Sequence, residues 1–246
     1  MEARQEFYDF EYYLSLEYRY FSRSHRGRVS SLLNFLGDIS NKSILDFGGG
    51  AGHLAYFMSQ RGAKVTVADY SKAALTFGAA RFPTLSFVEA DYKNLSSIKE
   101  EYPIITCFDV IEHLAEPQLL LANLAQCLEA GGKLYISTDN EMSPFATNHL
   151  LKRLDNYWRC LSGEGRDYAL IKKVESYRRS ILNKDYHQSH VQEFSPTRLK
   201  ELLEQNGWQT DMFIGYHLWS NPLKNLITKL LGKESATAFA YCCSRR

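Results

Sequence analysis

The pattern of apolar and polar residues changes regularly between residues 43 and 139. Short, nearly continuous apolar runs predict buried strands, and longer amphipathic segments between them predict helices. The predicted strands are Ser43–Phe47, Lys64–Asp69, Ser86–Ala90, Ile104–Phe108 and Lys133–Thr138. The predicted helices are His53–Arg61, Ser71–Arg81, Leu95–Glu100 and Pro117–Leu128, with helix C-caps at Gly62 and at Gly131–Gly132. This alternation predicts an α/β fold with a doubly wound, Rossmann-like sheet.

The alternation stops after residue 140 and resumes near residue 195. Residues 141–194 indicate a helical insertion that covers a substrate, with helices around Phe145–Leu161 and Arg166–Leu182. Ser195 and Pro196 are typical of a helix start. The remaining predicted elements are a helix at Thr197–Asn206, a strand at Trp208–Tyr216, a short amphipathic helix at Pro222–Leu231 and a last strand at Ala236–Ser244. Together with the earlier strands, they predict a seven-stranded sheet within a main domain at 41–246.

The first 40 residues predict a helical cap on that domain. Apolar, largely aromatic residues recur at helical spacing across 2–22, and a second helix is predicted at Val29–Leu36. We interpret the first helix as a packing surface, with an aromatic lid over a substrate pocket as the alternative. The run between the helices holds Arg19, Arg23, Arg26 and Arg28. We interpret these arginines as a solvated face, with binding of an anionic substrate group as the alternative.

Composition narrows the class of protein. The chain has 246 residues, of which 45% are hydrophobic and 23% charged, and its net charge of +1 gives no reason to expect nucleic-acid binding. No apolar run reaches the ~20 residues that span a bilayer. The five cysteines form no C-x-x-C pair, so we expect reduced thiols, no metal site and a cytoplasmic location. Adjacent Cys242 and Cys243 are expected on opposite faces of a strand.

The stretch ILDFGGGAGHLA at 44–55 is the strongest candidate for chemistry. It predicts a buried strand, a glycine-rich turn at Gly48–Gly52 and the start of a helix. Glycine lets a backbone approach a ligand closely, and the free amides at a helix start point toward the turn. The stretch therefore predicts a cradle for a nucleotide-type cofactor.

Two acids frame this turn, Asp46 before it and Asp69 at the end of the second predicted strand. An acid at the end of the second strand, such as Asp69, suits the hydroxyls of an adenosine ribose. NAD also contains such a ribose. However, His53 stands where the dinucleotide fingerprint has its third glycine. Asp46 would also repel a pyrophosphate at the helix start, whereas it would favour a cationic ligand. These residues favour a cationic adenosyl cofactor over NAD.

The motifs DFGGGAG, VADY, EADY and FDVIEHL follow one another at separations that resemble the class I S-adenosylmethionine-dependent methyltransferases. Within them, the chain resembles the small-molecule group that includes quinone-biosynthesis and sugar methyltransferases. The resemblance is clear over about 40–140 and weaker over 187–244. It implies S-adenosylmethionine as cofactor and an antiparallel last strand between the fifth and sixth strands.

The resemblance also implies roles for the cofactor-binding residues. Three glycines would form the turn under the amino-acid part of the cofactor, with Asp46 near its ammonium group and Asp69 on the ribose hydroxyls. The other residues implied by the motifs contact the adenine or line the methionine side. The full set is Asp46, Gly48, Gly50, Gly52, Asp69, Tyr70, Asp91, Tyr92, Phe108 and Asp109. For Asp91, a turn or cap acid is the alternative.

Methyl transfer needs an aligned nucleophile and, for some acceptors, a general base. We predict His113, in the EHL motif, and His190 as candidate bases, with His149 and His187 as weaker candidates. For His113 a structural histidine is the alternative. Asn140, just after the fifth predicted strand, lies where substrate usually enters this fold.

The methyl acceptor is predicted only as an O, N or C atom of a small molecule. Residues 150–186 carry nine Lys and Arg against five acids, which hints at an anionic small molecule, although a solvated helix face explains the charges as well. No N/D-P-P-Y/F motif for nucleic-acid bases follows the fourth predicted strand. The alternatives are an NAD-dependent oxidoreductase and a catalytically silent, cofactor-binding partner subunit. A homodimer is compatible with this sequence.

Overall fold

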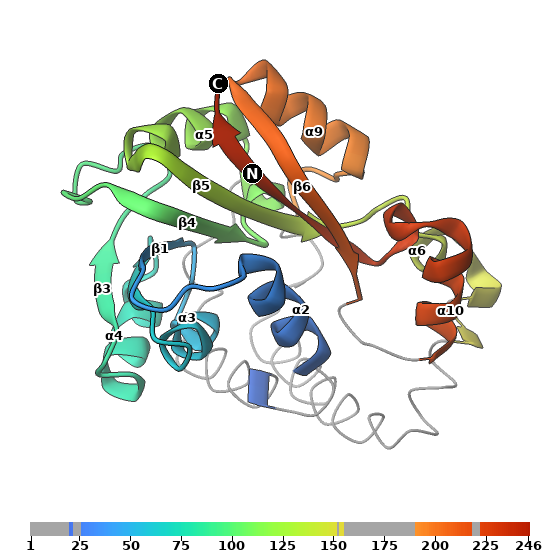
Figure 1. Ribbon diagram of the computed structural model, residues 1–246, viewed down its shortest axis with the longest axis horizontal. Helices are drawn as coiled ribbons and strands as arrows, with labels where there is room; N and C mark the ends of the chain where they lie inside the picture. The colour runs from blue at the N-terminus through green and yellow to red at the C-terminus, as the bar shows by residue number, and fades with distance from the viewer. Residues whose placement is uncertain (1–19, 22–25, 152, 155–189, 218–221) are drawn as a thin grey trace, which may run out of the picture.

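A seven-stranded sheet forms the centre of the computed structural model, which describes residues 20–21, 26–151, 153–154, 190–217 and 222–246 (Figure 1). The strand order is β3-β2-β1-β4-β5-β7-β6. β7 pairs antiparallel with β5 and β6, and the pairs among β1 to β5 are parallel. The strands are β1 Ser43–Phe47, β2 Lys64–Asp69, β3 Ser86–Glu89, β4 Tyr102–Phe108, β5 Leu128–Asp139, β6 Trp208–Tyr216 and β7 Ala238–Arg245. The predicted doubly wound sheet with one antiparallel strand is confirmed.

Helices cover both faces of the sheet (Figure 1). One face carries α2, α3 and α4, and the other carries α5 and α9. The α-helices are α2 Arg26–Leu36, α3 His53–Ser59, α4 Lys72–Arg81, α5 Pro117–Gln126, α6 Pro144–Thr147, α9 Pro196–Gln205 and α10 Pro222–Leu231. Short 3₁₀ turns, η2 Ile111–His113 and η4 Lys233–Ser235, follow β4 and α10. None of the helices described is both long and apolar enough to cross a membrane.

Each face of the sheet has its own apolar cluster. Because successive side chains of a strand point to opposite faces, neighbours such as Ile44 and Leu45 belong to different clusters. Cys242 lies in the cluster with Leu32 of α2, and Cys243 lies in the cluster with Leu199 of α9. The expectation that the two cysteines face opposite ways is confirmed.

Two local predictions are wrong. The segment Leu95–Glu100 forms turns in place of a helix. The side chains of Asp91 and Asn94 accept the amides of Lys93 and Ser96 at 2.8 Å and 2.9 Å, and such bonds compete with helix formation. Gly131 and Gly132 lie inside β5 and do not cap a helix, because α5 ends at Gln126.

The helix predicted at Phe145–Leu161 is interrupted. α6 ends at Thr147, and the Asn148 side chain accepts the amides of Leu150 and Leu151 at 3.0 Å and 3.2 Å, as an N-cap does. The rest of that helix, the one at Arg166–Leu182 and most of the aromatic helix at 2–22 lie outside the described residues. The division into a cap at 1–40 and a main domain stays a prediction.

Helix α4 packs directly against the glycine turn through Gly78. A Cβ at this position would lie 2.6 Å from the carbonyl oxygen of Ala51 and 2.5 Å from the Phe87 ring. Real Cβ atoms do not approach backbone this closely, so α4 or the turn would have to move. The position of α4 therefore depends on a helical glycine.

We predict that Gly78→Ala lowers the free energy of unfolding by about 1–3 kcal/mol, the cost of overpacking a core. Helix propensity alone would give the opposite sign, because alanine is favoured over glycine by about 1 kcal/mol inside a helix. Chemical denaturation measures the difference. Thr76→Ala, at an exposed position of the same helix, is the control and should leave stability almost unchanged. A stabilised Gly78→Ala variant would contradict the packing.

Candidate active site

The carboxyl ends of β1, β2, β4 and β5 meet at one edge of the sheet, where ligands bind in open α/β folds. The glycine turn follows β1 at this edge. The Gly48 amide donates to the Ala68 carbonyl at 2.7 Å, and the Gly50 amide donates to Asp69 Oδ2 at 2.9 Å. Both bonds fasten the turn to β2.

The turn has no room for side chains at Gly48 and Gly49. A Cβ on Gly48 would lie 2.3 Å from Val110, and one on Gly49 would lie 2.4 Å from Asp46 Oδ2. Gly52, with a φ of 80°, begins α3 without a side-chain cap. The first amides of α3 therefore have no capping side chain. The sequence predicted roles for Gly48, Gly50 and Gly52 but missed the tight approach at Gly49.

Asp46 lies buried beneath this turn. Its Oδ1 accepts the Thr106 hydroxyl at 2.7 Å, and its Oδ2 has no hydrogen-bond partner among the described residues. Burial raises the pKa of Asp46 to about 7, with a smaller contribution from Asp69, while Thr106 opposes the rise. A cation on the turn would offset the cost of ionising this carboxyl group.

Asp69 holds two segments of main chain together. Its carboxylate accepts the amides of Gly50 and Ser71, the latter at 2.8 Å. Burial raises the pKa of Asp69, and these backbone amides oppose the rise. Each carboxylate oxygen has two lone pairs, so both can still accept from a ligand. Asp69 is thus a structural residue of the turn as well as a candidate ligand.

The EADY residues lie beside Asp69, because the Ala90 amide donates to the Asp69 carbonyl at 3.0 Å. Asp91 is exposed and stabilises the turn that contains Lys93. This contact agrees with the alternative of a turn acid and leaves the carboxylate accessible. Tyr92 is buried in the apolar cluster of the α5 face, and Tyr70 is half-buried next to Asp69.

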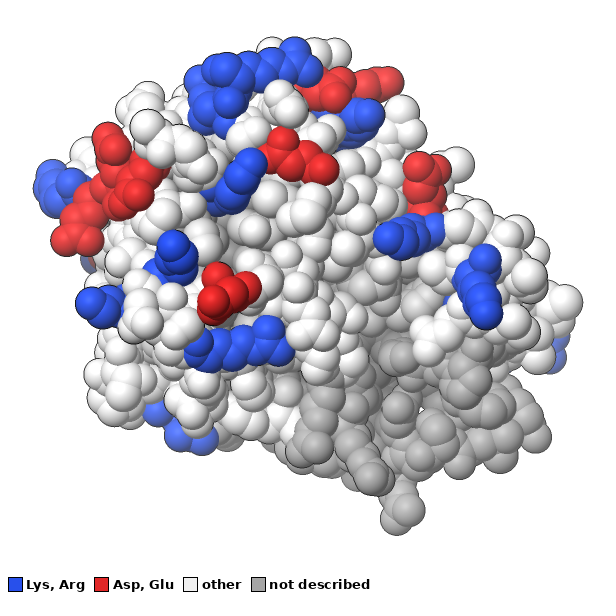
Figure 2. Space-filling view, in the orientation of Figure 1, with Lys and Arg blue, Asp and Glu red and all other residues white. Residues whose placement is uncertain are grey.

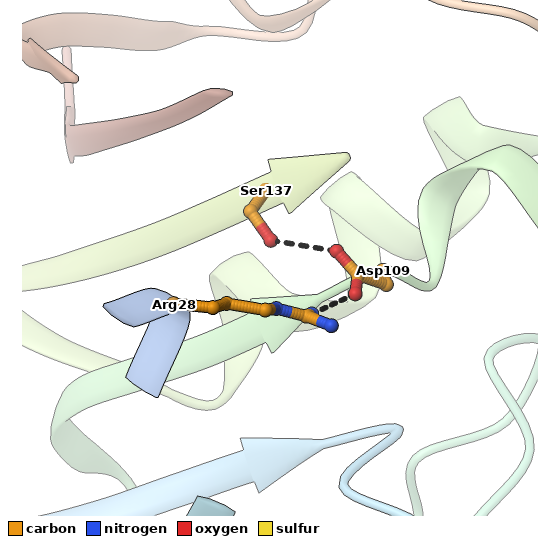
Figure 3. Close-up of polar contacts among 3 residues, drawn as sticks. All are labelled: Arg28, Asp109 and Ser137. Atoms are coloured by element: carbon orange, nitrogen blue, oxygen red, sulfur yellow. Dashed lines mark hydrogen bonds and ion pairs between the residues drawn. The ribbon is translucent and has the colours of Figure 1, made fainter. Parts of the chain in front are cut away.

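Asp109 follows β4 and makes the ion pair that connects α2 to the site (Figure 3). Its carboxylate accepts from Arg28 Nη2 and, at 3.1 Å, from the Ser137 hydroxyl. Asp109 adopts a φ of 56°, a left-handed conformation that costs energy for a residue other than glycine. These two contacts hold it there. Phe108 lies just before it, with its ring packed in the cluster of the α2 face.

The interpretation of the arginine run as a solvated face is wrong for Arg28. Its side chain is 11% exposed and pairs with Asp109. Burial lowers the pKa of Arg28, but the surrounding Tyr20, Tyr216, Asp139 and Glu112 raise it overall. The burial of Arg28 could have been predicted from helical spacing. Arg28 shares a helix face with Leu32, Phe35 and Leu36, which are buried. Arg19 and Arg23 lie outside the described residues.

The two predicted bases come together although 77 positions separate them. The rings of His113 and His190 lie 5.0 Å apart, nearly edge to face. The Glu112 carbonyl accepts the amides of Val191 and Gln192 at 2.8 Å and 3.0 Å, so the chain after the insertion is fastened to η2. His149 is exposed elsewhere, and His187 lies outside the described residues.

Glu112 is a buried acid that the sequence analysis missed. Burial raises the pKa of its carboxyl group to about 8, Asp139 adds to the rise, and Thr138 and Arg28 oppose it. One ligand atom from each of Glu112, His113 and His190 lies within 4.8 Å of the others, a donor set that could hold a divalent cation. The predicted absence of a metal site rested on cysteine spacing, which carries no information about this cluster.

His53 fills the position of the missing fingerprint glycine and is buried. Its ring stacks on Tyr20 at 5.3 Å and meets Phe82 edge-on at 5.5 Å. Burial, with a smaller effect of Arg81, lowers the pKa of His53 to about 4, so the ring is neutral at pH 7. His53 therefore packs the helix start against the N-terminal segment.

Asn140 does not line an entrance. Its amide donates to the carbonyls of Glu234 and Ala236 at 2.7 Å and 2.8 Å, and its oxygen accepts the Met142 amide at 3.1 Å. These bonds tie the end of β5 to the start of β7. The position of Asn140 just after a strand did not predict its role, because its side chain is bonded to the backbone of nearby segments.

A family model described as "Methyltransferase domain" matches residues 20–211, most of the chain. The ubiquinone biosynthesis O-methyltransferase of Aeromonas salmonicida is 34% identical over 120 residues, which are 46% of this chain and 50% of that protein. The enzyme of the same name from Pseudomonas aeruginosa is 34% identical over 109 residues, 42% of this chain and 46% of that protein. The chain thus spans about half the length of the relatives it matches.

Solved structures share the fold at lower identity. The magnesium protoporphyrin IX methyltransferase of Synechocystis PCC 6803, with bound SAH, has a TM-score of 0.62 at 14% identity, covering 98% of both chains. An S-adenosylmethionine-dependent methyltransferase of Mesorhizobium loti has a TM-score of 0.58 at 14% identity, covering 88% of this chain and 96% of that one. With the strand order and the glycine turn described above, these matches confirm the predicted family: the chain belongs to the methyltransferase-domain family of class I S-adenosylmethionine-dependent enzymes.

Proposed function

We propose that the chain transfers a methyl group from S-adenosylmethionine to a hydroxyl oxygen of a small molecule. The observation that carries this proposal is the unpartnered Oδ2 of buried Asp46 beneath a turn without side chains. An acid in this position favours a cation and disfavours a pyrophosphate. Membership of the methyltransferase family excludes the NAD-dependent alternative.

The residues at the sheet edge fit this cofactor. The amides of the turn and of the first turn of α3 suit its amino-acid part, and Asp46 suits its ammonium group. Asp69 and exposed Asp91 offer carboxylate oxygens to the ribose hydroxyls and the adenine amino group, with Tyr70 against the adenine. Arg28 Nε has no partner among the described residues and would bind the carboxylate of the cofactor. When bound, S-adenosylmethionine supplies an activated methyl group on its sulfonium.

A hydroxyl acceptor needs a base, since it must lose its proton as the methyl group arrives. His113 and His190 form a pair near the carboxyl end of β4. Each is the sequence neighbour of a residue in the backbone contact between Glu112 and Val191. In the proposed reaction one imidazole accepts the acceptor proton and the other keeps it oriented. A divalent cation held by Glu112, His113 and His190 is the second candidate role for the same residues.

The relatives support oxygen as the acceptor atom, because the relatives that match somewhat less than half of this chain are named O-methyltransferases. The matched segment covers less than half of this chain, so the substrate is proposed only as a small hydroxylated molecule. An anionic acceptor, a cytoplasmic location and a homodimer stay predictions. A catalytically silent partner subunit is the competing proposal, and the acceptor experiment below separates the two.

Asp69→Ala should weaken binding of S-adenosylhomocysteine by at least about tenfold, because it removes a charged acceptor from the ribose and loosens Gly50. Isothermal titration calorimetry measures the affinity, and circular dichroism checks the fold. Asp38→Ala, an exposed acid before β1, is the matched control and should bind normally. Unchanged affinity in Asp69→Ala would mean that the acid is misassigned.

Binding of S-adenosylhomocysteine should release protons near pH 7. The free protein has an Asp46 pKa of about 7, and the ligand ammonium lowers it, so affinity should rise about tenfold between pH ~6 and pH ~8. Calorimetry in two buffers of different ionisation enthalpy measures the protons released. Asp46→Asn should abolish this pH dependence. An affinity that falls as pH rises would contradict the assignment.

The variants His113→Gln and His190→Gln should lower kcat by about 10²–10⁴-fold on a simple catechol probe while leaving S-adenosylhomocysteine affinity unchanged. His149→Gln, an exposed histidine outside the pair, is the control.

The same assay with a chelator distinguishes the two roles of the cluster. Activity that survives EDTA supports the base, whereas activity lost to EDTA and restored by Mg²⁺ or Zn²⁺ assigns the cluster to a cation. If a panel of phenols, catechols and amines shows no methylation while the cofactor analogue still binds, the silent partner subunit replaces the proposed function.

A further inference from the structure

Exposed large apolar side chains gather at one end of the described structure. Eight such residues are exposed in the part of the chain that the structure describes, and six of them belong to two segments around α6 and α10. We call these six the apolar tip: Met142, Leu150, Leu154, Leu226, Leu230 and Leu231. The other two, Phe21 and Met212, lie elsewhere in the chain.

The two segments of the apolar tip are held together by specific contacts. The Ser143 hydroxyl donates to the Ser235 carbonyl at 2.9 Å, and Lys224 Nζ lies 5.5 Å from the centre of the Phe145 ring. α6 and α10 lie side by side at the right end of the molecule in Figure 1. These contacts hold α6 against α10 and the segment that follows it.

Helix α10 exposes three leucines and buries a lysine. Lys224 is only 1% exposed, and Thr228 faces inward, where its hydroxyl lies 2.8 Å from His217 Nε2. Leu226, Leu230 and Leu231 face outward, and Leu230 is 73% exposed. These three leucines of α10 are therefore not packed on the sheet edge. Burying a leucine would be worth about 1.5–3 kcal/mol, so this outward face favours an apolar partner.

Charge indicates what kind of apolar partner fits. The exposed charged residues next to the leucines are Arg153, Lys229 and Lys233, against Glu234. The sequence that continues from the tip is also basic, with nine Lys and Arg against five acids between residues 150 and 186. In Figure 2 the described part of this end shows uncharged atoms with blue side chains among them and a red side chain at its upper margin. Leucines flanked by lysines are the features with which short helices bind anionic lipid surfaces.

A second copy of the chain fits this surface less well. A stable protein interface recruits about 20–30 residues a side, and its buried core is depleted of charge. The apolar tip offers six apolar residues interrupted by lysines and an arginine. A lipid surface needs no shape complementarity and tolerates a rim of cations.

We propose that the apolar tip docks the protein on an anionic lipid surface, with the leucines of α10 entering the interfacial region. The docking is peripheral and reversible, since α10 is a ten-residue helix. It is independent of the proposed methyl transfer, because it uses neither the glycine turn nor the histidine pair.

Co-sedimentation of the full chain with vesicles tests this surface. Wild-type protein should sediment with equimolar phosphatidylcholine and phosphatidylglycerol vesicles, and far less with phosphatidylcholine alone. The double variant Leu230→Ser/Leu231→Ser should bind at least about tenfold less. Met212→Ser, an exposed methionine on β6 outside the tip, is the matched control and should bind like wild type. The double variant Lys229→Glu/Lys233→Glu should bind the anionic vesicles more weakly. Its remaining binding should also depend less on the salt concentration.

Binding of S-adenosylhomocysteine and the thermal midpoint should be unchanged in all these variants, which separates docking from folding and from cofactor binding. Wild-type protein that stays in the supernatant overturns the proposal, and so does equal sedimentation of the leucine variant. Light scattering provides the remaining outcome. A wild-type dimer that the leucine substitutions convert to a monomer would assign the tip to a second copy and overturn the lipid surface.

Discussion

The site depends on close packing around the glycine turn at Gly48–Gly52. Val110 closes on Gly48, the Asp46 carboxyl group lies against Gly49, and α4 reaches the turn through Gly78. The Asp69 carboxylate then fixes the turn by accepting the Gly50 amide. Because these contacts come from β1, β2, α4 and the segment after β4, a single added Cβ would shift the turn relative to all of them. The cradle for a ligand is thus a consequence of how tightly the elements around it approach one another.

Buried carboxyl groups dominate the electrostatics of this edge of the sheet. Asp46, Asp69 and Glu112 all have pKa values raised by burial, and the largely buried cation Arg28 acts on Glu112 among them. An excess of buried carboxyl groups makes the arrival of a cation favourable, because the cation offsets the desolvation cost of ionising them. The family membership of the chain and the chemistry of the edge therefore agree. Asp109, held in a left-handed conformation between Arg28 and Ser137, connects this edge to α2.

The histidine pair and the apolar tip are each formed by segments that lie far apart in the sequence. Backbone bonds from Val191 and Gln192 to the Glu112 carbonyl bring His190 to His113. Side-chain bonds from Asn140 and Ser143 to the residues around η4 hold the α6 and α10 segments together. In both cases polar contacts to main-chain atoms set the position of the returning segment.

The sequence by itself determined the sheet, the glycine turn and the family. Strand and helix periodicity is local, and the spacing of DFGGGAG, VADY and EADY reflects consecutive βα units, so β1, β2 and β6 are predicted to the residue. Tertiary structure alone decided the burial of Arg28, the raised pKa of Glu112, the pairing of His113 with His190 and the outward leucines of α10. These features depend on which distant segments come into contact, and local patterns carry no record of that. The failed helix at Leu95–Glu100 has a local cause, since Asp91 and Asn94 bond to the backbone that a helix would need.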